Sequence, residues 1–314
     1  MIDVENRQKI QSLMDNIEKV FLGKTETVKR TLIGLFAGGH LLIEDVPGVG
    51  KTVLAKTLAK SLDGSFQRIQ FTPDLLPSDI LGVSILNTAN DQFVFKRGPI
   101  FANVILADEI NRTTPRTQSS LLEAMNDSQV SVDGVTYRLP KPFIVIATQN
   151  PIEYEGTYPL PESQLDRFLM RLRIGYPDVP DERRVLYSQK MRHPIESIEP
   201  VITANDVLRI QQDVRSVRVD ESISDYILAI VNHTRGHEHL EVGVSPRGSL
   251  GLFRAAQSLA YVEGRDYVVP DDVKGLAVPV LAHRIIPRSF RQDGRRGASE
   301  RIINEALEAV SVPL

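Results

Sequence analysis

Residues 45–52, with the sequence DVPGVGKT, form a candidate phosphate-binding loop. Glycines let the backbone wrap closely around phosphate oxygens, and a following helix directs its first N–H groups at them. The amine of Lys51 would reach the β- and γ-phosphates, and the hydroxyl of Thr52 would bind Mg²⁺. The general pattern has glycine where this chain has Asp45, so a plain strand-to-helix connection is the alternative. The expected nucleotide contacts are Pro47, Gly48, Val49, Gly50, Lys51, Thr52 and Val53.

The apolar segment 104–107 leads directly into two carboxylates, Asp108 and Glu109. Mg²⁺ keeps part of its hydration shell in proteins, so Asp108 is expected to hold the ion through water. Glu109 is suited to act as general base on the attacking water. A solvated strand end is the alternative for these two carboxylates, but their combination with Lys51 favours a nucleotide site.

A third polar group, Asn150, follows the apolar segment 143–148. Its amide would orient the attacking water or contact the γ-phosphate. The alternative is a simple turn, because Asn-Pro is a common turn signal. Together the three motifs predict ATP or ADP with Mg²⁺ as the ligand.

The elements that would position these residues alternate between strands and helices. Helical spacing covers 7–37 with a break at Gly23, and 114–126 is also helical. This alternation predicts an α/β core in which helices flank a parallel five-stranded sheet. An insertion at 79–97 and a hairpin at 130–139, with a tight turn at Asp133-Gly134, interrupt it. The predicted strands are 40–44, 65–71, 104–108, 143–148 and 168–174.

A proline-rich stretch, YPDVPD at 176–181, marks a boundary beyond which strand signals stop. We therefore predict a nucleotide-binding core at 1–177 and a small all-helical lid at 178–314. The predicted lid helices are 181–190, 204–214, 220–234, 246–262, 270–283 and 298–310.

Composition narrows the class of protein. The 314 residues carry a net charge of −3, which gives no overall field to attract nucleic acid or an anionic membrane. Cysteine is absent, which excludes disulfides and thiolate metal sites and suits a cytoplasmic location. The most apolar windows, such as 275–282, are far too short to span a membrane.

Four stretches give the chain a resemblance to the MoxR family of AAA+ ATPases over almost its whole length. The stretches are IEDVPGVGKT (43–52), LADEINR (106–112), ATQNPIEYEGTYPLPESQLDRF (147–168) and GVSPRG (243–248). The last two are more specific than a phosphate-binding loop, because they are long and phosphate binding alone does not require them.

The resemblance implies further roles. Asn150 matches the sensor 1 position, Arg167 the arginine finger and Arg247 the sensor 2 of the lid. Gly23 and Lys24 match the segment that lines the adenine pocket. The insertion and the hairpin resemble the helix-2 insert and the pre-sensor-1 hairpin of that clade. Asp45 is acceptable at its position in this family.

Arginine suits these roles because its planar guanidinium is always charged and can neutralise a transferring phosphoryl group. A finger supplied by a neighbour would make the lone subunit a poor ATPase. A surface ion pair beside Asp166 is the alternative for Arg167. Arg112, Arg171 and Arg173 are rival fingers.

Two other clusters carry less weight. His233, His237 and His239 lack the carboxylates or thiols that complete a structural zinc site, so a polar link between helices is favoured. The arginine-rich segment 284–296 has few aromatic side chains for stacking on bases, so a solvated or inter-subunit face is favoured over nucleic acid.

The resulting hypothesis is an ATPase that binds ATP where core and lid meet and remodels a protein partner. The resemblance implies a hexameric ring and a chaperone-like role, with a partner that carries a von Willebrand factor A domain. A nucleic-acid motor is one alternative, although the hairpin at 130–139 offers only Arg138 as a cation. A nucleotide-gated scaffold with little turnover is another.

Overall fold

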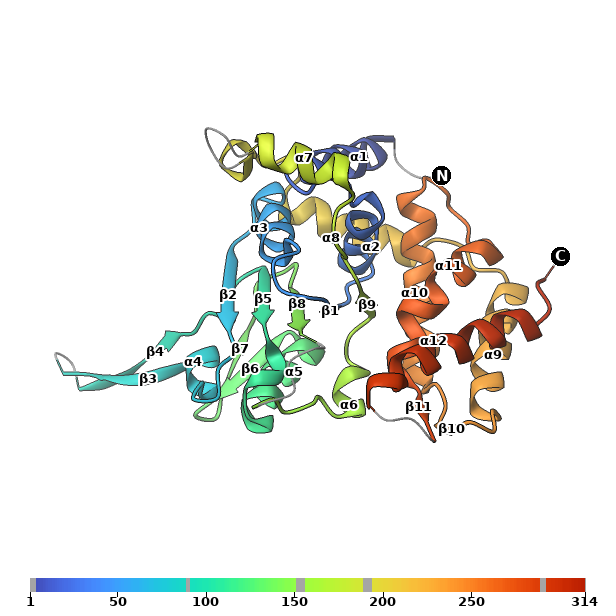
Figure 1. Ribbon diagram of the computed structural model, residues 1–314. Coiled ribbons are helices and arrows are strands. Elements are labelled where there is room, and N and C mark those ends of the chain that lie inside the picture. Colours follow the sequence, from blue (N-terminus) through green and yellow to red (C-terminus); the bar gives the residue numbers. More distant parts are fainter. Residues whose placement is uncertain (1–3, 89–90, 151–155, 189–193, 289–291, 314) are drawn as a thin grey trace.

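The computed structural model describes residues 4–88, 91–150, 156–188, 194–288 and 292–313. Its centre is a parallel five-stranded sheet, so the predicted fold class is confirmed (Figure 1). In sheet order the strands are β2 (Phe66–Gln70), β5 (Val104–Asp108), β8 (Ile144–Gln149), β1 (Leu41–Glu44) and β9 (Met170–Leu172).

The strands form because their apolar side chains alternate between two separate cores. Leu41 and Ile43 of β1 join one hydrophobic cluster, whereas Leu42 joins the other. In β5, Leu106 and Ile105 divide in the same way. Successive side chains of a strand point to opposite faces, so a sheet buried on both faces needs a nearly continuous apolar run.

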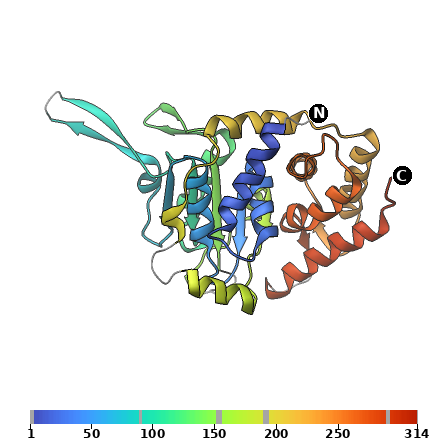
Figure 2. The same cartoon turned by 90° about the horizontal axis from the view of Figure 1, so that it is seen from above.

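Different helices cover the two faces. The face of the sheet that carries Leu41 and Ile43 is covered by the amino-terminal helices, as Figure 2 shows. Helix α5 covers the other face through Leu121, Leu122 and Met125. The helices of this half are α1 (Val4–Glu18), α2 (Thr25–Phe36), α3 (Lys51–Ser61), α4 (Pro77–Leu81), α5 (Pro115–Asp127) and α6 (Glu162–Leu165), with a short 3-10 turn, η1 (Ile110–Arg112).

Two hairpins interrupt the core, one within the predicted insertion at 79–97 and one at the predicted hairpin at 130–139. Strands β3 (Gly82–Asn87) and β4 (Gln92–Arg97) form a long hairpin that projects from the body (Figure 1). Strands β6 (Gln129–Val132) and β7 (Val135–Arg138) form the second. Its turn residues Asp133 and Gly134 both have positive φ, 51° and 77°, as a tight hairpin turn requires.

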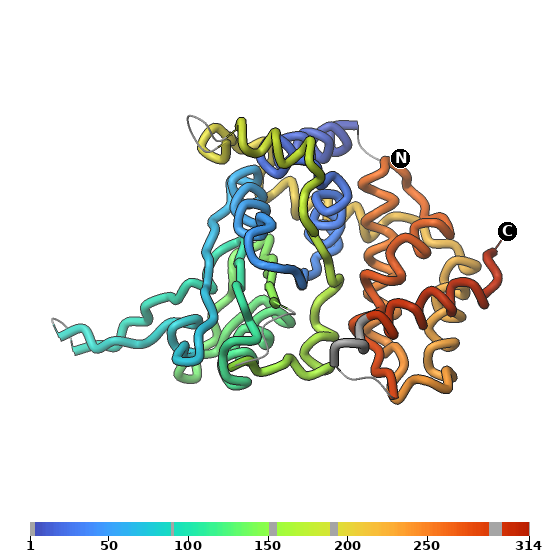
Figure 3. Tube along the Cα trace, in the orientation of Figure 1, coloured from blue at the N-terminus to red at the C-terminus, as the bar shows by residue number. Residues whose placement is uncertain are grey.

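The chain beyond β9 is mostly helical. After β9 it rises to α7, as the tube in Figure 3 shows, and then continues into the remaining helices. The first predicted lid helix extends to residue 190, but residues 189 and 190 lie outside the described part. The helices are α7 (Val179–Ser188), α8 (Ala204–Arg215), α9 (Glu221–Arg235), α10 (Pro246–Val262), α11 (Pro270–Leu281) and α12 (Gln292–Ala309), with 3-10 turns η2 (Pro194–Ser197) and η3 (Ala282–Arg284).

The expectation that strands stop at residue 177 is wrong for one small pair. Strands β10 (Leu240–Val242) and β11 (Ile286–Pro287) pair antiparallel. Segments of three and two residues are too short to leave a detectable period in the sequence, which is why the pattern misses them.

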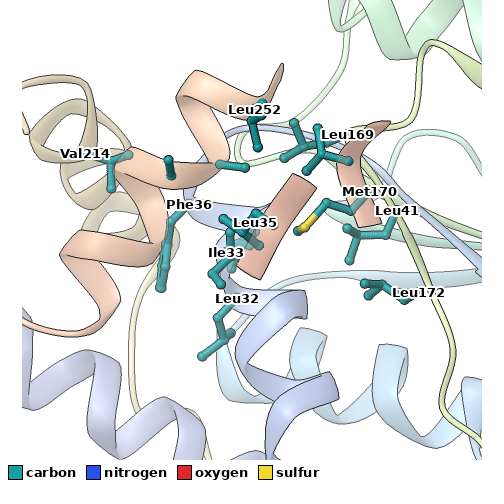
Figure 4. Close-up of a cluster of buried hydrophobic side chains, with 14 of the residues drawn as sticks. Leu32, Ile33, Leu35, Phe36, Leu41, Leu169, Met170, Leu172, Val214 and Leu252 are labelled. Atoms are coloured by element: carbon teal, nitrogen blue, oxygen red, sulfur yellow. The ribbon is translucent and has the colours of Figure 1, made fainter. Parts of the chain in front are cut away.

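One continuous hydrophobic cluster joins the sheet to the later helices. Figure 4 shows Leu32, Phe36 and Met170 packed close to Val214 and Leu252. Helix α10 packs against α2, α8 and α11, and the Ser258 hydroxyl of α10 donates to the Ile33 carbonyl of α2 at 2.9 Å. Among the helices that the structure describes, none combines the length and the apolar character needed to cross a bilayer.

Candidate nucleotide-binding site

A pocket of about 320 Å³ opens at the carboxyl ends of β1, β5 and β8. The loop after β1 and the first turn of α3 form one wall, and Asp108 and Glu109 form another. Gly48 and Gly50 have φ values of 87° and 96°, which L side chains rarely adopt. The lining residues are Pro47, Gly48, Gly50, Lys51, Thr52, Val53, Arg68, Asp108, Glu109 and Asn150.

Lys51 is the cation at the base of this loop. Its amine donates to the backbone carbonyl of Asp45. Burial lowers the pKa of Lys51, and the carboxylates of Asp45, Asp108 and Glu109 oppose that shift. A cation whose charge is costly to bury gains most from a nearby polyanion, so this amine suits a phosphate group.

Asp45 explains why the chain departs from glycine at the start of the loop. One carboxylate oxygen accepts from the Val46 amide at 2.8 Å. The other accepts from the amides of Ile174 and Gly175, both at 2.7 Å. The side chain therefore ties the phosphate-binding loop to the segment that follows β9, which a glycine cannot do.

Asp45→Gly is expected to lower the free energy of unfolding by about 3 kcal/mol, because it leaves the buried amide of residue 174 and the half-buried amide of residue 175 without an acceptor. Urea denaturation measures this loss. Asp45→Asn keeps one acceptor oxygen and should lose less. An unfolding midpoint unchanged by Asp45→Gly would show that these hydrogen bonds do not hold the loop.

The two carboxylates are held in fixed positions. The Thr148 hydroxyl donates to Asp108 at 2.7 Å and accepts from the Glu109 amide at 2.9 Å. Glu109 has a φ of 57°, an unusual conformation for a residue with a side chain. Such conformations persist where surrounding contacts enforce them and cluster at functional sites.

Two functional candidates escape sequence analysis, and both come from β2. Arg68 donates to one oxygen of Asp108 through Nη2 and Nε, at 2.6 and 3.0 Å. The amide of Gln70 donates to Glu109 at 2.8 Å. The only signal in the sequence is the polar residues at alternate positions of β2, which do not reveal the neighbouring strand.

The donor set fits a magnesium nucleotide. Thr52 offers a hydroxyl and Asp108 a carboxylate to the same pocket, and Mg²⁺ prefers such oxygen ligands. Asn150, which is 6% exposed, lines the pocket just beyond β8. The predicted base, amide and metal ligands therefore meet in one cavity.

Three predicted contacts lie near the pocket without lining it. Val49 packs against the hydrophobic cluster beneath the loop. Gly23 lies against Asp181 of α7, where an added Cβ would overlap that carboxylate. The Lys24 amine donates to the Tyr176 carbonyl at 2.7 Å. Residues 23 and 24 therefore adjoin the segment that leads into α7.

Arg167 and Arg247 lie at the opposite edge of the sheet. Arg167 donates to the Leu122 carbonyl and Arg247 to the Asn126 side chain, both at 2.6 Å. These partners belong to the last turns of α5, beside His40, which precedes β1. Strands of four to six residues separate the two edges by roughly 13–20 Å.

The expectation that ATP binds where core and lid meet stays a prediction, and Val53 of the pocket packs against a small cluster that includes Ile195 of the predicted lid. All lining residues of the pocket come from between positions 47 and 150. Helix α10, whose first turn carries Arg247, packs against α2, α8 and α11. The lid residue is therefore remote from the pocket of its own chain.

The rival arginines are placed as follows. Arg112 lies 3.3 Å from Glu109 at the pocket. Arg171 of β9 lies 3.6 Å from Glu44 and 3.5 Å from Glu300 of α12. Arg173 is exposed just beyond β9.

The two less favoured clusters are resolved in part. The ring of His237 lies near those of His233 and His239, with centroids 5.9 and 5.6 Å apart and the planes inclined, but no group of three or more potential metal ligands is found among the described residues. In the arginine-rich segment, Arg284 is buried and Arg288 donates to the Leu240 carbonyl at 2.8 Å. Arg291 and the side chains of Arg295 and Arg296 lie outside the described part.

Comparisons with known proteins agree with this architecture. Residues 40–170 match the ATPase family associated with various cellular activities (AAA), and residues 232–306 match the AAA lid domain. The uncharacterized protein YeaC of Bacillus subtilis is 52% identical over 302 residues, covering 96% of this chain and 94% of its own. Chaperone MoxR1 of Mycobacterium tuberculosis is 42% identical over 306 residues, covering 95% and 80%. A crystal structure from Cytophaga hutchinsonii, described as a candidate ATPase, has a TM-score of 0.89 and 39% identity, covering 99% and 97%.

Proposed function

Because the chain belongs to the MoxR family of AAA+ ATPases, we propose that it hydrolyses ATP to ADP and phosphate in the pocket at residues 47–150. The supporting observation is that Lys51, Thr52 and the two carboxylates line a single cavity. A phosphate loop, a magnesium ligand and a base at one place are what phosphoryl transfer to water requires.

The roles follow from position. The loop amides and Lys51 would hold the β- and γ-phosphates, and Thr52 and Asp108 would hold Mg²⁺, which would neutralise charge on the phosphates. Glu109 takes a proton from the attacking water, and Asn150 orients that water. Gln70 fixes the direction of the Glu109 carboxylate through the hydrogen bond described above.

The remaining cations act on another copy of the chain. Arg167 and Arg247 lie at the edge of the sheet remote from their own pocket, farther than an arginine side chain reaches. A closed ring joins the pocket of one copy to the opposite edge of the next through a repeated head-to-tail interface. We therefore propose a homo-oligomeric ring, a hexamer as the family resemblance implies, in which each neighbour completes the site.

The proposed work of the ring is chaperone-like remodelling of a protein partner in the cytoplasm. Its support is the relative named Chaperone MoxR1. We further propose that the partner carries a von Willebrand factor A domain. The chain is proposed to divide into a core at 1–177 and a lid at 178–314.

Specific ATPase activity is expected to rise with protein concentration, because the finger comes from a neighbour. Steady-state hydrolysis and sedimentation velocity, measured on the same dilution series, test this. Activity per subunit should follow the fraction assembled. An activity that stays constant while the rings dissociate would contradict completion of the site by a neighbour, and stimulation by DNA would favour a nucleic-acid motor.

A further inference from the structure

A buried guanidinium lies close to the two remote cations. Arg284, at the end of η3, has a side chain that is only 2% exposed. It pairs with the Asp166 carboxylate and donates to the carbonyls of Asp166 at 2.9 Å and Phe168 at 2.6 Å. Its Nε donates to the Val280 carbonyl at 2.7 Å. Arg284 therefore binds the turn before β9 to the end of α11.

Asp166 connects this guanidinium to both cations. It immediately precedes Arg167 in the chain. Its carboxylate also accepts from the Ser245 hydroxyl at 3.3 Å. Ser245 caps α10 by accepting from the Gly248 amide at 3.2 Å, so the turn that carries Arg247 is fixed to the same carboxylate.

The two cations also share a support on their other side. Arg167 bonds to Leu122 and Arg247 to Asn126, which are four residues apart on α5. Residues at this spacing lie next to each other on one face of a helix. The cations are therefore held as neighbours, between α5 and the Asp166–Arg284 pair.

Burying this ion pair has an energetic cost. Burial lowers the pKa of Arg284, and the Asp166 carboxylate opposes that shift. Well-packed apolar side chains stabilise a fold as well as a buried ion pair does in many proteins. What apolar residues cannot supply is the forked set of donors that fixes two chain segments relative to each other.

We propose that Arg284 is a positioning residue that sets Arg167 and Arg247 as one rigid cationic unit for the nucleotide of the neighbouring copy. This inference rests on the proposed completion of each site by a neighbour. Arg284 itself touches no nucleotide. Its role is to make the lid cation and the core cation move together.

Arg284→Lys tests this proposal, because it keeps the positive charge and removes the forked set of guanidinium donors. We expect kcat to fall about 10²-fold, as misplacement of a catalytic group by about 1 Å does elsewhere. The dissociation constant for ATP, measured on the same protein with a fluorescent ATP analogue, should stay unchanged, because Lys51, Thr52 and Asp108 are intact and the two cations act on charge that develops during transfer. A parallel loss of ATP affinity would overturn the proposal, since it would show general damage to the fold.

The double variant Asp166→Leu with Arg284→Met distinguishes a loss of positioning from a folding defect. This pair of changes removes both charges together and should keep the melting temperature close to that of the native chain. The proposal predicts a similar loss of kcat in this variant. Native kcat in a well-folded double variant would overturn it.

Mixed rings provide the directional test. Glu109→Gln copies have an inactive pocket and an intact cationic edge, so adding them to Arg284→Lys copies should restore turnover in the Arg284→Lys pockets. The matched mixture contains Arg167→Ala in place of Arg284→Lys. Rescue of Arg167→Ala without rescue of Arg284→Lys would overturn this inference alone. Rescue of neither would overturn completion by a neighbour, and this inference with it.

Discussion

Arg167→Ala is expected to lower ATP turnover by about 10³- to 10⁵-fold, the range found for arginine fingers in phosphoryl transfer. The charge that develops on the transferring phosphoryl group needs a cation, and Arg167 lies at the edge that would face the next pocket in the proposed ring. ATP binding should be preserved, because the finger stabilises charge that develops only in the transition state, whereas Lys51 and Thr52 of the pocket remain in place. Single-turnover hydrolysis and equilibrium binding on the assembled protein separate the two effects.

The control for this variant is Arg173→Ala. Arg173 directly follows β9, the strand that Arg167 precedes, and is exposed, so its removal tests a rival finger with little effect on packing. Loss of the hydrogen bond from Arg167 to the Leu122 carbonyl should cost about 1 kcal/mol of stability. A collapse of turnover in Arg173→Ala, with Arg167→Ala active, would transfer the role to the rival.

Glu109→Gln is expected to lower turnover by about 10²- to 10⁴-fold, the usual contribution of a general base. Glutamine has the shape of glutamate and can still interact with Gln70, but it cannot take a proton from water. The pocket should still bind ATP with Mg²⁺, because Lys51, Thr52 and Asp108 are unchanged. A rapid-quench experiment with excess protein measures the chemical step directly.

Glu123→Gln is the matched control, because Glu123 is an exposed carboxylate on α5. It should hydrolyse ATP at the native rate. If Glu109→Gln also kept native turnover, Glu109 would lose its assignment as the base. The inactive, ATP-bound form that we expect would also serve to capture the protein partner, since it should stay in one nucleotide state.

The sequence was a good guide wherever one strand determines the position of a residue. Lys51 and Asp108 each follow an apolar strand, and parallel strands bring such ends to one edge of the sheet. Arg68 and Gln70 depend instead on the pairing of β2 with β5, which sets Gln70 opposite Asp108. No local pattern encodes that pairing.

The position of Arg247 is the clearest example of what sequence could not supply. Its spacing from Ser245 places it correctly in the first turn of a helix. Where that helix lies depends on packing between α10, α2 and α8, and on contacts such as the one from Ser258 to Ile33. Such contacts join residues more than two hundred positions apart, so only the folded chain reveals the edge at which Arg247 emerges.

The hydrophobic cluster that runs from β1 through α2 into α10 has a mechanical consequence. Close-packed interiors have low compressibility and transmit strain. A displacement of α10 is therefore transmitted through this cluster towards β1 and the phosphate-binding loop that follows it. Each copy of the chain moves as a nearly rigid body. In the proposed ring, the interfaces between copies would then be the most deformable part, and ATP hydrolysis would rotate whole subunits relative to one another.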